Sequence, residues 1–456
     1  MKKSSILLLL FFASFNIFSQ YQDSILIKRI FIEALSSRVA YENLKYLCKN
    51  TKGRISGTPQ AEAAVEFARQ TMLDMGLDTV FLQEVMVKRW VRGDREIASV
   101  FSEISGNNEL TISGLGTSVG TGNEGITGKV VEAYSFEDLE KLGTENIKGR
   151  IVFFNRPMDP TLYNTFEAYG LAANQRTSGA SEAAKYGAIG VIIRSLTTSL
   201  DDFPHTGVLY YKKGIPEIPA VCVSTFDANL LNGLLKEDPD LELHLVSNCM
   251  NQGEVPSFNV VGELKGSGYP EQIITIGGHL DAWDTGEGAH DDGTGCIQSI
   301  EVLRLFQVLG IQPKRTIRAV MFMDEEIAQR GGLKYAELAA QNKENHYAAI
   351  ESDGGGLSPR GFGFSATDDR LGRLLNLQKY FEPYGINQFS RGGGGADIGP
   401  LQQFGTLLIS PDLDMQRYFD YHHSPNDTFE QVNIRELQLG SAAIAALVYL
   451  IDKYDL

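Results

Sequence analysis

The chain has few cysteines and lacks several motifs that particular classes of protein require. It has four cysteines in 456 residues, and no two form a CxxC pair. A disulfide framework and a zinc ribbon are therefore excluded, although one disulfide bond stays open. Cys222 and Cys296 lie in apolar sequence, which favours small buried side chains. The chain also lacks a GxSxG motif, and glycine-rich residues 391–405 lack GxxxxGK[ST], so neither a serine nucleophile nor a nucleotide site is predicted.

Basic residues and long apolar runs are also scarce. The formal net charge is −16, which repels polyanions, so we expect no nucleic acid as a partner. The one long apolar run, residues 4–18, follows Lys2 and Lys3 and ends in polar sequence. This order is typical of a secretory signal peptide, residues 1–19, rather than a membrane span. We therefore expect a secreted or periplasmic protein.

The rest of the chain divides by its pattern into three parts. Residues 20–96 begin with two predicted helices, over 24–48 and 58–77, and a strand. Residues 97–251 have short apolar runs between glycine turns and predict a small β-rich insert. Residues 252–456 alternate apolar runs with helical segments, which predicts a mixed, largely parallel sheet flanked by helices. We expect an α/β fold in which 20–96 and 252–456 form one catalytic domain.

Titratable side chains follow three of the predicted strands. His279 and Asp281 come after "IITIGG", the pair Glu325 and Glu326 follows "AVMFMD", and Asp353 follows "YAAIES". Because ligands of open α/β sheets collect at the carboxyl ends of strands, these side chains are expected to meet at one edge. Imidazole and carboxylate groups are natural zinc ligands where no thiolate is available.

The segment "GGHLDAWDTGEGAHDDGTG", residues 277–295, adds a glycine-rich loop to this edge. Glycines allow the backbone to turn tightly, so one carboxylate of the loop, Asp291, can approach two metal ions. Near the end of the chain, "YHHSPNDT" offers His422 and His423 before a polar turn. A histidine pair is more often a structural feature, unless a metal site elsewhere lacks an imidazole.

In this order, "GGHLDAWDTGEGAHDDGTG", "FMDEEIAQRGG", "ESDGG" and "YHHSPNDT" resemble the motifs of the co-catalytic zinc exopeptidases. "GASEAAKYGAIGVIIRS" and "DDFPHTG" in the insert look similar to the protease-associated domain of the carboxypeptidase Q group, as does "RISGTP" near the start. The resemblance implies a zinc exopeptidase fold with an inserted protease-associated domain. It covers nearly all of the chain after residue 19.

The resemblance also implies a role for each matching residue. Two zinc ions would be bound by His279, Asp291, Glu326, Asp353 and His423, with Asp291 bridging them. Asp281 would orient the imidazole of His279, and Glu325 would be the general base. The pattern H[ST]xxDT selects His423 over His422 as the ligand.

The expected activity is hydrolysis of small peptides or dipeptides, as a carboxypeptidase or dipeptidase. Arg391 or Arg417 could bind a substrate carboxylate, although either could equally be a surface charge. Two alternatives stay open: an aminopeptidase on the same scaffold, and a catalytically inactive homologue that binds without reacting. The sequence also leaves a homodimer open.

Overall fold

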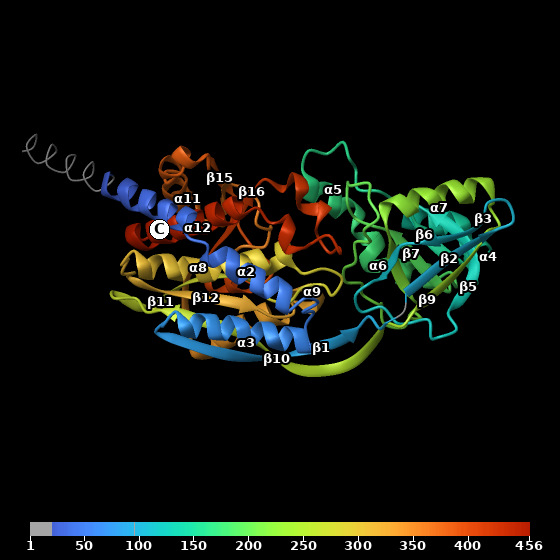
Figure 1. The fold of residues 1–456 in the computed structure, drawn as a ribbon, viewed down its shortest axis with the longest axis horizontal. Coiled ribbons are helices and arrows are strands. Elements are labelled where there is room, and N and C mark those ends of the chain that lie inside the picture. The colour runs from blue at the N-terminus through green and yellow to red at the C-terminus, as the bar shows by residue number, and fades with distance from the viewer. Residues whose placement is uncertain (1–20, 95) are drawn as a thin grey trace, which may run out of the picture.

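The structure is a computed structural model that describes residues 21–94 and 96–456. The signal peptide predicted for residues 1–19 lies outside the described residues and stays a prediction. The described chain forms two lobes that lie end to end (Figure 1). We call residues 96–247 the second lobe, and the remaining described residues the body.

The body is built on a mixed eight-stranded sheet. Its strands lie in the order β1 (Thr79–Val91), β10 (Met250–Leu264), β12 (Arg315–Phe322), β11 (Tyr269–His279), β13 (Asn345–Glu351), β16 (Leu407–Leu413), β14 (Pro359–Phe364) and β15 (Gln388–Arg391). The four central strands, from β12 to β16, run parallel, whereas β10 and β14 run antiparallel to their central neighbours. The predicted sheet, mixed and largely parallel, is confirmed.

Helices cover both faces of this sheet, which explains why its central strands have continuous apolar sequences. One face packs against α2 (Val39–Asn50), α3 (Pro59–Asp74), α8 (Thr294–Val308) and α12 (Ile434–Tyr454). The opposite face packs against α10 (Arg330–Asn342) and η4 (Gly399–Phe404). The other short elements of the body are η1 (Ala289–Gly293), α9 (Glu325–Ala328), α11 (Asp368–Leu375), η2 (Gln378–Tyr380), η3 (Glu382–Tyr384), η5 (Met415–Asp420) and η6 (Phe429–Gln431).

The second lobe has its own eight-stranded sheet. Its strands lie in the order β3 (Gly106–Leu110), β2 (Glu96–Ser102), β9 (Glu242–Ser247), β5 (Ile126–Ala133), β6 (Ile151–Phe154), β7 (Gly190–Arg194), β8 (Ala220–Val223) and β4 (Ile112–Gly114). The helices of this lobe are α4 (Phe136–Ile147), α5 (Thr165–Ala172), α6 (Asn174–Ala184) and α7 (Thr225–Glu237). A strand-rich unit therefore separates the two parts of the body in the chain, while its identity as a protease-associated domain stays a prediction.

The start of the body differs from the prediction. The single helix expected over 24–48 is two helices, because residues 21–36 form one and α2 forms the next. At the break, the Ser37 hydroxyl accepts a hydrogen bond from the Val39 amide at 3.2 Å. Short polar side chains favour such local bonds over a continuous helix, and the apolar spacing does not reveal the break.

Two further expectations concern membranes and cysteines. Among the described residues, α12 is the one helix long and apolar enough to cross a membrane, and 72% of its most apolar window is buried in the body. All four cysteines are free and buried, which confirms the interpretation of Cys222 and Cys296 as small core residues.

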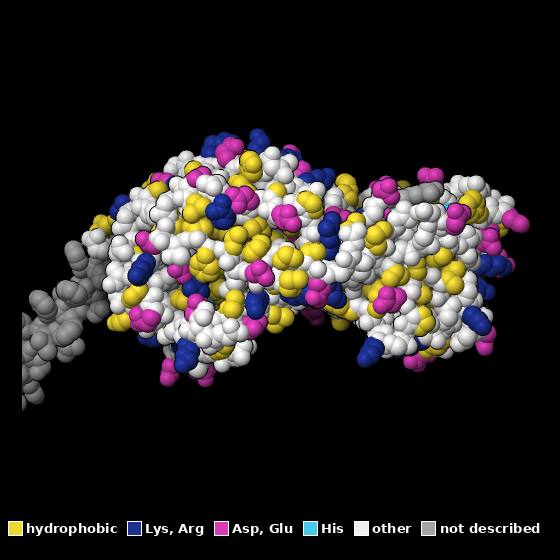
Figure 2. Space-filling view, turned by 90° about the horizontal axis from the view of Figure 1, so that it is seen from below, with side chains coloured by type: hydrophobic (Ala, Val, Ile, Leu, Met, Phe, Trp, Pro, Cys, Tyr) yellow, Lys and Arg dark blue, Asp and Glu magenta, His cyan; other side chains and the backbone are white. Residues whose placement is uncertain are grey.

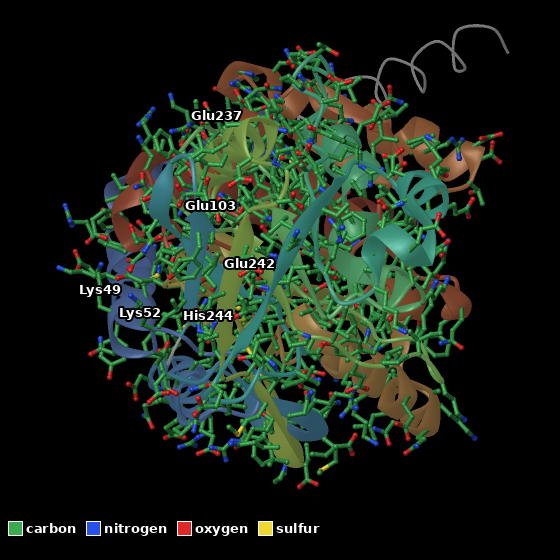
Figure 3. The ribbon with its side chains drawn as sticks, turned by 90° about the vertical axis from the view of Figure 1, so that its right-hand side faces the viewer. Lys49, Lys52, Glu103, Glu237, Glu242 and His244 are labelled. Carbon is green, nitrogen blue, oxygen red and sulfur yellow. The ribbon has the colours of Figure 1, made fainter. Side chains whose placement is uncertain are left out.

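Charged side chains are dispersed over the surface of both lobes in the view of Figure 2. The outer end of the second lobe, seen in Figure 3, presents Glu103, Glu237, Glu242 and His244. His244 contacts Thr127 there, and His346 lies near the start of β13. The other five histidines gather in one region: His279, His422 and His423 lie next to Asp291, His290 precedes Asp291 in the chain, and His205 contacts the carbonyl of His422.

Candidate metal centre

Three neighbouring strands end at the same edge of the body sheet. His279 is the last residue of β11, Glu325 and Glu326 follow β12, and Asp353 follows β13. Because β12 and β13 pair in parallel with β11 on its two sides, their carboxyl ends lie together. The structure therefore brings these predicted residues to one place.

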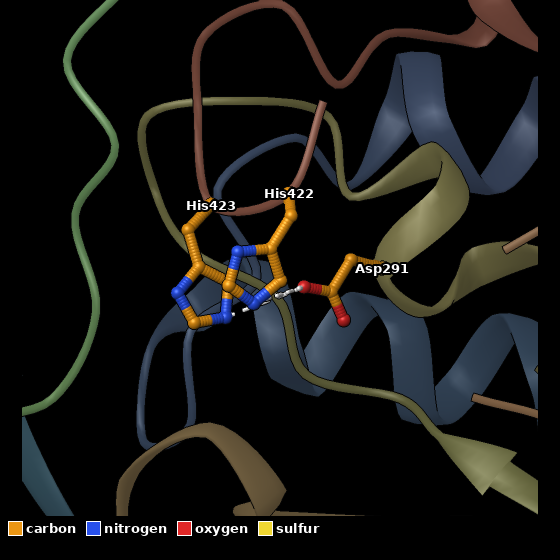
Figure 4. A group of neighbouring side chains, drawn as sticks. All are labelled: Asp291, His422 and His423. Carbon is orange, nitrogen blue, oxygen red and sulfur yellow. Dashed lines mark ion pairs between the residues drawn. The ribbon is translucent and has the colours of Figure 1, made fainter. Parts of the chain in front are cut away.

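Asp291 lies between two imidazoles. Its Oδ1 is 3.1 Å from His279 Nε2, and its Oδ2 is 3.3 Å from His423 Nε2. His279 Nε2 also lies 3.3 Å from Asp353 Oδ1, and His423 Nε2 lies 3.0 Å from Glu326 Oε2. We call His279 and Asp353 with Asp291 Oδ1 the first half-site, and Glu326 and His423 with Asp291 Oδ2 the second. Figure 4 shows His422 and His423 directed toward Asp291.

The carboxylate of Asp281 connects the first half-site to the loop after β12. It accepts hydrogen bonds from the backbone amides of Asp324, Glu325 and Glu326 at 2.8, 3.1 and 3.3 Å. The expected contact to His279 is made instead by the Asp281 backbone carbonyl, which lies 2.9 Å from Nδ1, whereas the carboxylate is 3.9 Å away. Asp281 therefore positions the two glutamates as well as the imidazole.

Two buried charged residues fix the loop that carries Asp291. The Arg54 guanidinium donates to the carbonyls of Leu280, Glu287 and Gly288 at 2.6, 2.5 and 2.7 Å. The Asp427 carboxylate accepts from the backbone amides of residues 290 and 291 at 2.7 and 3.1 Å. These contacts complement the curved backbone, so the loop presents Asp291 in a fixed position.

Burial and charge together change the acidity of the site. Burial raises the pKa of Glu325 to about 8, and the negative charges of Asp353 and Asp281 add to this effect. Burial and the negative charge of Asp291 raise the pKa of Glu326 well above its usual value. Asp291 behaves differently. Burial opposes its ionisation, but the hydrogen bond from His279 and the charge of His423 hold its pKa below the usual range. Crowded buried carboxylates of this kind are stabilised in their ionised form by a cation.

The donor atoms fit zinc. His279 with Asp291 and Glu326, His279 with Asp292 and Asp353, and Asp291 with His422 and His423 form three overlapping groups whose donor atoms lie within 4.8 Å of one another. Asp291 Oδ2 and Glu326 Oε1 are buried and accept no hydrogen bond in the described part of the chain. Unpaired buried carboxylate oxygens next to imidazole nitrogens match the ligand chemistry of zinc.

The remaining predicted residues have other partners. His422 stacks on His423 with ring centres 3.5 Å apart, and its Nε2 is 3.9 Å from Asp291 Oδ2. Arg391 donates to the Ala366 carbonyl and pairs with Asp368, and Arg417 contacts Tyr421 and Glu436. Both guanidinium groups are thus engaged outside the two half-sites, and their role with substrate stays a prediction.

Four positioning residues were not predicted. Asp292 accepts from the backbone amides of His279 and Gly295, and Glu351 accepts from those of residues 396–398. Arg54 lies in "RISGTP" and Asp427 in "HSPNDT", so the charged residue inside each motif was the sequence signal that could have identified these two positioning residues. Nothing in the motifs indicates that their partners are backbone groups of another loop.

Comparisons with known proteins identify the family of the chain. Residues 259–448 match the model of peptidase family M28. Carboxypeptidase Q of Bos taurus and that of Homo sapiens are each 34% identical over 412 residues, which is 90% of this chain and 85% of theirs. The crystal structure of a peptidase M28 precursor from Shewanella amazonensis is 32% identical and superposes with a TM-score of 0.90, covering 94% of this chain and 96% of that one. A zinc aminopeptidase from Bacillus subtilis, 19% identical with a TM-score of 0.66, shares the fold; the alignment covers 91% of this chain and 95% of that one.

The fold and the acidic, imidazole-bearing edge of the sheet define a zinc-dependent metallopeptidase, a hydrolase of peptide bonds. The similarity to the carboxypeptidase Q proteins extends over nearly all of the chain. The chain belongs to peptidase family M28.

Proposed function

We propose that the chain is an exported dizinc exopeptidase that releases carboxyl-terminal residues from small peptides and splits dipeptides. In this proposal His279, Asp291 and Asp353 bind the first zinc ion, and Asp291, Glu326 and His423 bind the second. The observation that carries it is the position of Asp291, whose two carboxylate oxygens face two different imidazoles. A carboxylate so placed is suited to bridge two ions.

The side chains of the site have distinct tasks in this reaction. Bound zinc would polarise the scissile carbonyl and lower the pKa of a water molecule. Glu325 is the group that accepts the proton of the attacking water and delivers it to the leaving amine. Its carboxylate accepts one hydrogen bond in the described part of the chain, a long one from Gln329 Nε2 at 3.3 Å, which leaves lone pairs to take a proton. Asp281 fixes the backbone at Glu325 and so aims this carboxylate.

A cavity next to Asp353 supports a small peptide as substrate. It has a volume of about 230 Å³ and is lined by Phe166 of α5 in the second lobe, by Leu413 and Met415 of the body, and by the polar side chains of Glu351, Asp353 and Ser410. A concave pocket with an apolar part and a few polar groups is the usual site for a substrate side chain. We propose that it takes an apolar side chain of the substrate.

The choice of a carboxypeptidase rests on the carboxypeptidase Q relatives, which are similar over most of their length. More distant relatives include an aminopeptidase of Pseudomonas aeruginosa, 27% identical over 67% of this chain. Two blocked dipeptides separate these activities: N-acetyl-Phe-Leu has no free amine, and Phe-Leu amide has no free carboxylate. We expect the zinc-loaded protein to release leucine from the first and to act much more slowly on the second.

The opposite preference would establish an aminopeptidase. Hydrolysis of unblocked Phe-Leu alone would establish a strict dipeptidase, and hydrolysis of none of the three peptides by protein containing two zinc ions would establish a binding homologue. Zinc-free protein, prepared with a chelator, is the control, and its activity should return when zinc is added. The export part of the proposal is tested by sequencing the amino terminus of the protein recovered outside the cytoplasm, which should begin near residue 20.

A further inference from the structure

The second lobe reaches into the metal centre with one short segment, residues 205–207. His205 Nδ1 donates to the carbonyl of His422 at 2.7 Å, and the Thr206 amide donates to the carbonyl of His423 at 2.9 Å. The Thr206 carbonyl lies 3.3 Å from His423 Nδ1. The backbone and the ring of the second half-site histidine are thus both contacted by the other lobe.

The contact at Nδ1 decides which way the His423 ring faces. A ring nitrogen that donates to a carbonyl leaves the other nitrogen, here Nε2, as an acceptor aimed at Glu326 and Asp291. His279 has the same arrangement, but its carbonyl comes from Asp281 in the body. The first half-site is therefore oriented within one lobe, and the second half-site is oriented across two.

The segment is fixed by its own lobe. Thr206 Oγ1 donates to the Gly114 carbonyl at 2.7 Å, and the Gly207 carbonyl accepts from the Gly116 amide at 2.9 Å. His205 and Thr206 are almost completely buried. The Thr206 carbonyl also accepts from Arg176 Nη1 at 3.4 Å, so both sides of this oxygen are occupied. A shift of the second lobe would move the carbonyl that orients His423.

The following inference rests on the proposed function. We propose that residues 205–207 of the second lobe are a positioning element of the second zinc site, so that zinc affinity there depends on the position of the second lobe against the body. His205 and Gly207 are its positioning residues. Gly207 has φ +134°, and a Cβ atom there would lie 2.8 Å from His423 Nδ1 and 2.6 Å from Arg176 Cζ. Any larger residue must displace the ring or the arginine.

The test is a zinc titration of Gly207→Ala with a competing chelating dye that resolves the two binding steps. We expect the second zinc ion to bind about 10- to 100-fold more weakly, which is the usual effect of losing the hydrogen-bond partner of a metal ligand. The affinity for the first zinc ion should not change. Gly214→Ala is the matched control, since Gly214 also has a positive φ, at +83°, but nothing lies within 4 Å of its Cβ position. This control should keep both affinities.

A second pair of variants does not depend on how alanine is accommodated at Gly207. His205→Ala removes the donor to the His422 carbonyl, and His205→Asn restores one at the position of Nδ1. We expect weaker binding of the second zinc ion in the alanine variant and recovery in the asparagine variant. Wild-type affinities in both Gly207→Ala and His205→Ala would overturn the inference.

A double substitution separates positioning from general damage. If Gly207 acts through His423, Gly207→Ala should change the one remaining zinc affinity of His423→Ala very little. A further loss in that background, or equal weakening of both steps in the single variant, would show a merely structural effect and overturn the inference. A wild-type chain that takes up fewer than two zinc ions would instead overturn the proposed function, and this is measured before any variant is made.

Discussion

The first and second half-sites use the same side-chain types but are built by different parts of the molecule. His279 and Asp353 lie at the ends of adjacent parallel strands, and the body alone supplies their partners. His423 lies on a turn near the end of the chain, and the carbonyl behind its ring belongs to the second lobe. The first arrangement is rigid because the sheet fixes both backbones, whereas the second depends on how two lobes meet.

The loop of Asp291 is shared by both half-sites and contacts both lobes. Within the body, Arg54 and Asp427 bond to its backbone. Asp284 of this loop forms an ion pair with Arg92 of the body at 2.6 Å, and Arg92 in turn donates to Ser113 Oγ of the second lobe at 2.7 Å. Trp283 packs directly against Gly116 of the second lobe, where a Cβ atom would lie 1.8 Å from the indole. The second lobe is therefore in contact with the metal loop as well as with the histidine turn.

The largest effect is expected where the two half-sites join. Asp291→Asn should weaken both zinc ions by at least about 100-fold and reduce peptide hydrolysis to background, because one carboxylate faces both imidazoles. Zinc content after dialysis and the rate on N-acetyl-Phe-Leu measure this. Asp284→Asn, in the same loop, should keep both ions. Loss of a single ion in Asp291→Asn would show that Asp291 serves only one half-site.

Glu325→Gln should leave both half-sites intact and remove the chemistry. We expect kcat to fall by about 10²- to 10⁴-fold, the usual contribution of a general base, with two zinc ions retained. Steady-state kinetics together with metal analysis gives both numbers. Retention of wild-type kcat would exclude Glu325 as the base, and metal loss would assign it a ligand role.

His423→Ala should break the second half-site alone. One zinc ion should remain, and kcat should fall by about 100-fold, because only the second half-site loses a ligand. The adjacent His422→Ala is the matched control, and it should retain more zinc because its Nε2 lies farther from Asp291. Equal metal loss in the two variants would contradict the assignment of His423.

The smallest effect is expected at the contact between the lobes. Arg92 pairs with Asp284 within the body and donates to Ser113 Oγ of the second lobe. Arg92→Ala therefore removes a largely buried ion pair together with a bond between the lobes, and should lower the free energy of unfolding by about 3 kcal/mol. Weaker binding of the second zinc ion, by less than about 10-fold, should accompany it. Thermal unfolding and zinc titration measure these effects. Arg69→Ala, which breaks an exposed pair with Glu66, should change neither, and an equal change there would remove the link to the lobe contact.

Much of this site could be predicted because its chemistry follows the order of the strands. Apolar runs identified β11, β12 and β13, and the residues after them were the titratable groups that the structure brings together. The break before α2 was not predicted, because a helical apolar pattern continues through Ser37. The position of Arg391 was not predictable either, since an exposed arginine at the end of a short edge strand has no periodic pattern that fixes its direction.

The sequence by itself determined that His279, the Glu325–Glu326 pair and Asp353 come together, because side chains at the carboxyl ends of neighbouring parallel strands meet at one edge of a sheet. Tertiary structure decided which backbone groups hold each donor side chain in place. The carbonyl of Thr206 contacts a ring 217 positions away, and Arg54 binds carbonyls more than 220 positions away. Every residue has a backbone carbonyl, so such contacts have no residue signature, and only the folded chain shows which carbonyl reaches which side chain.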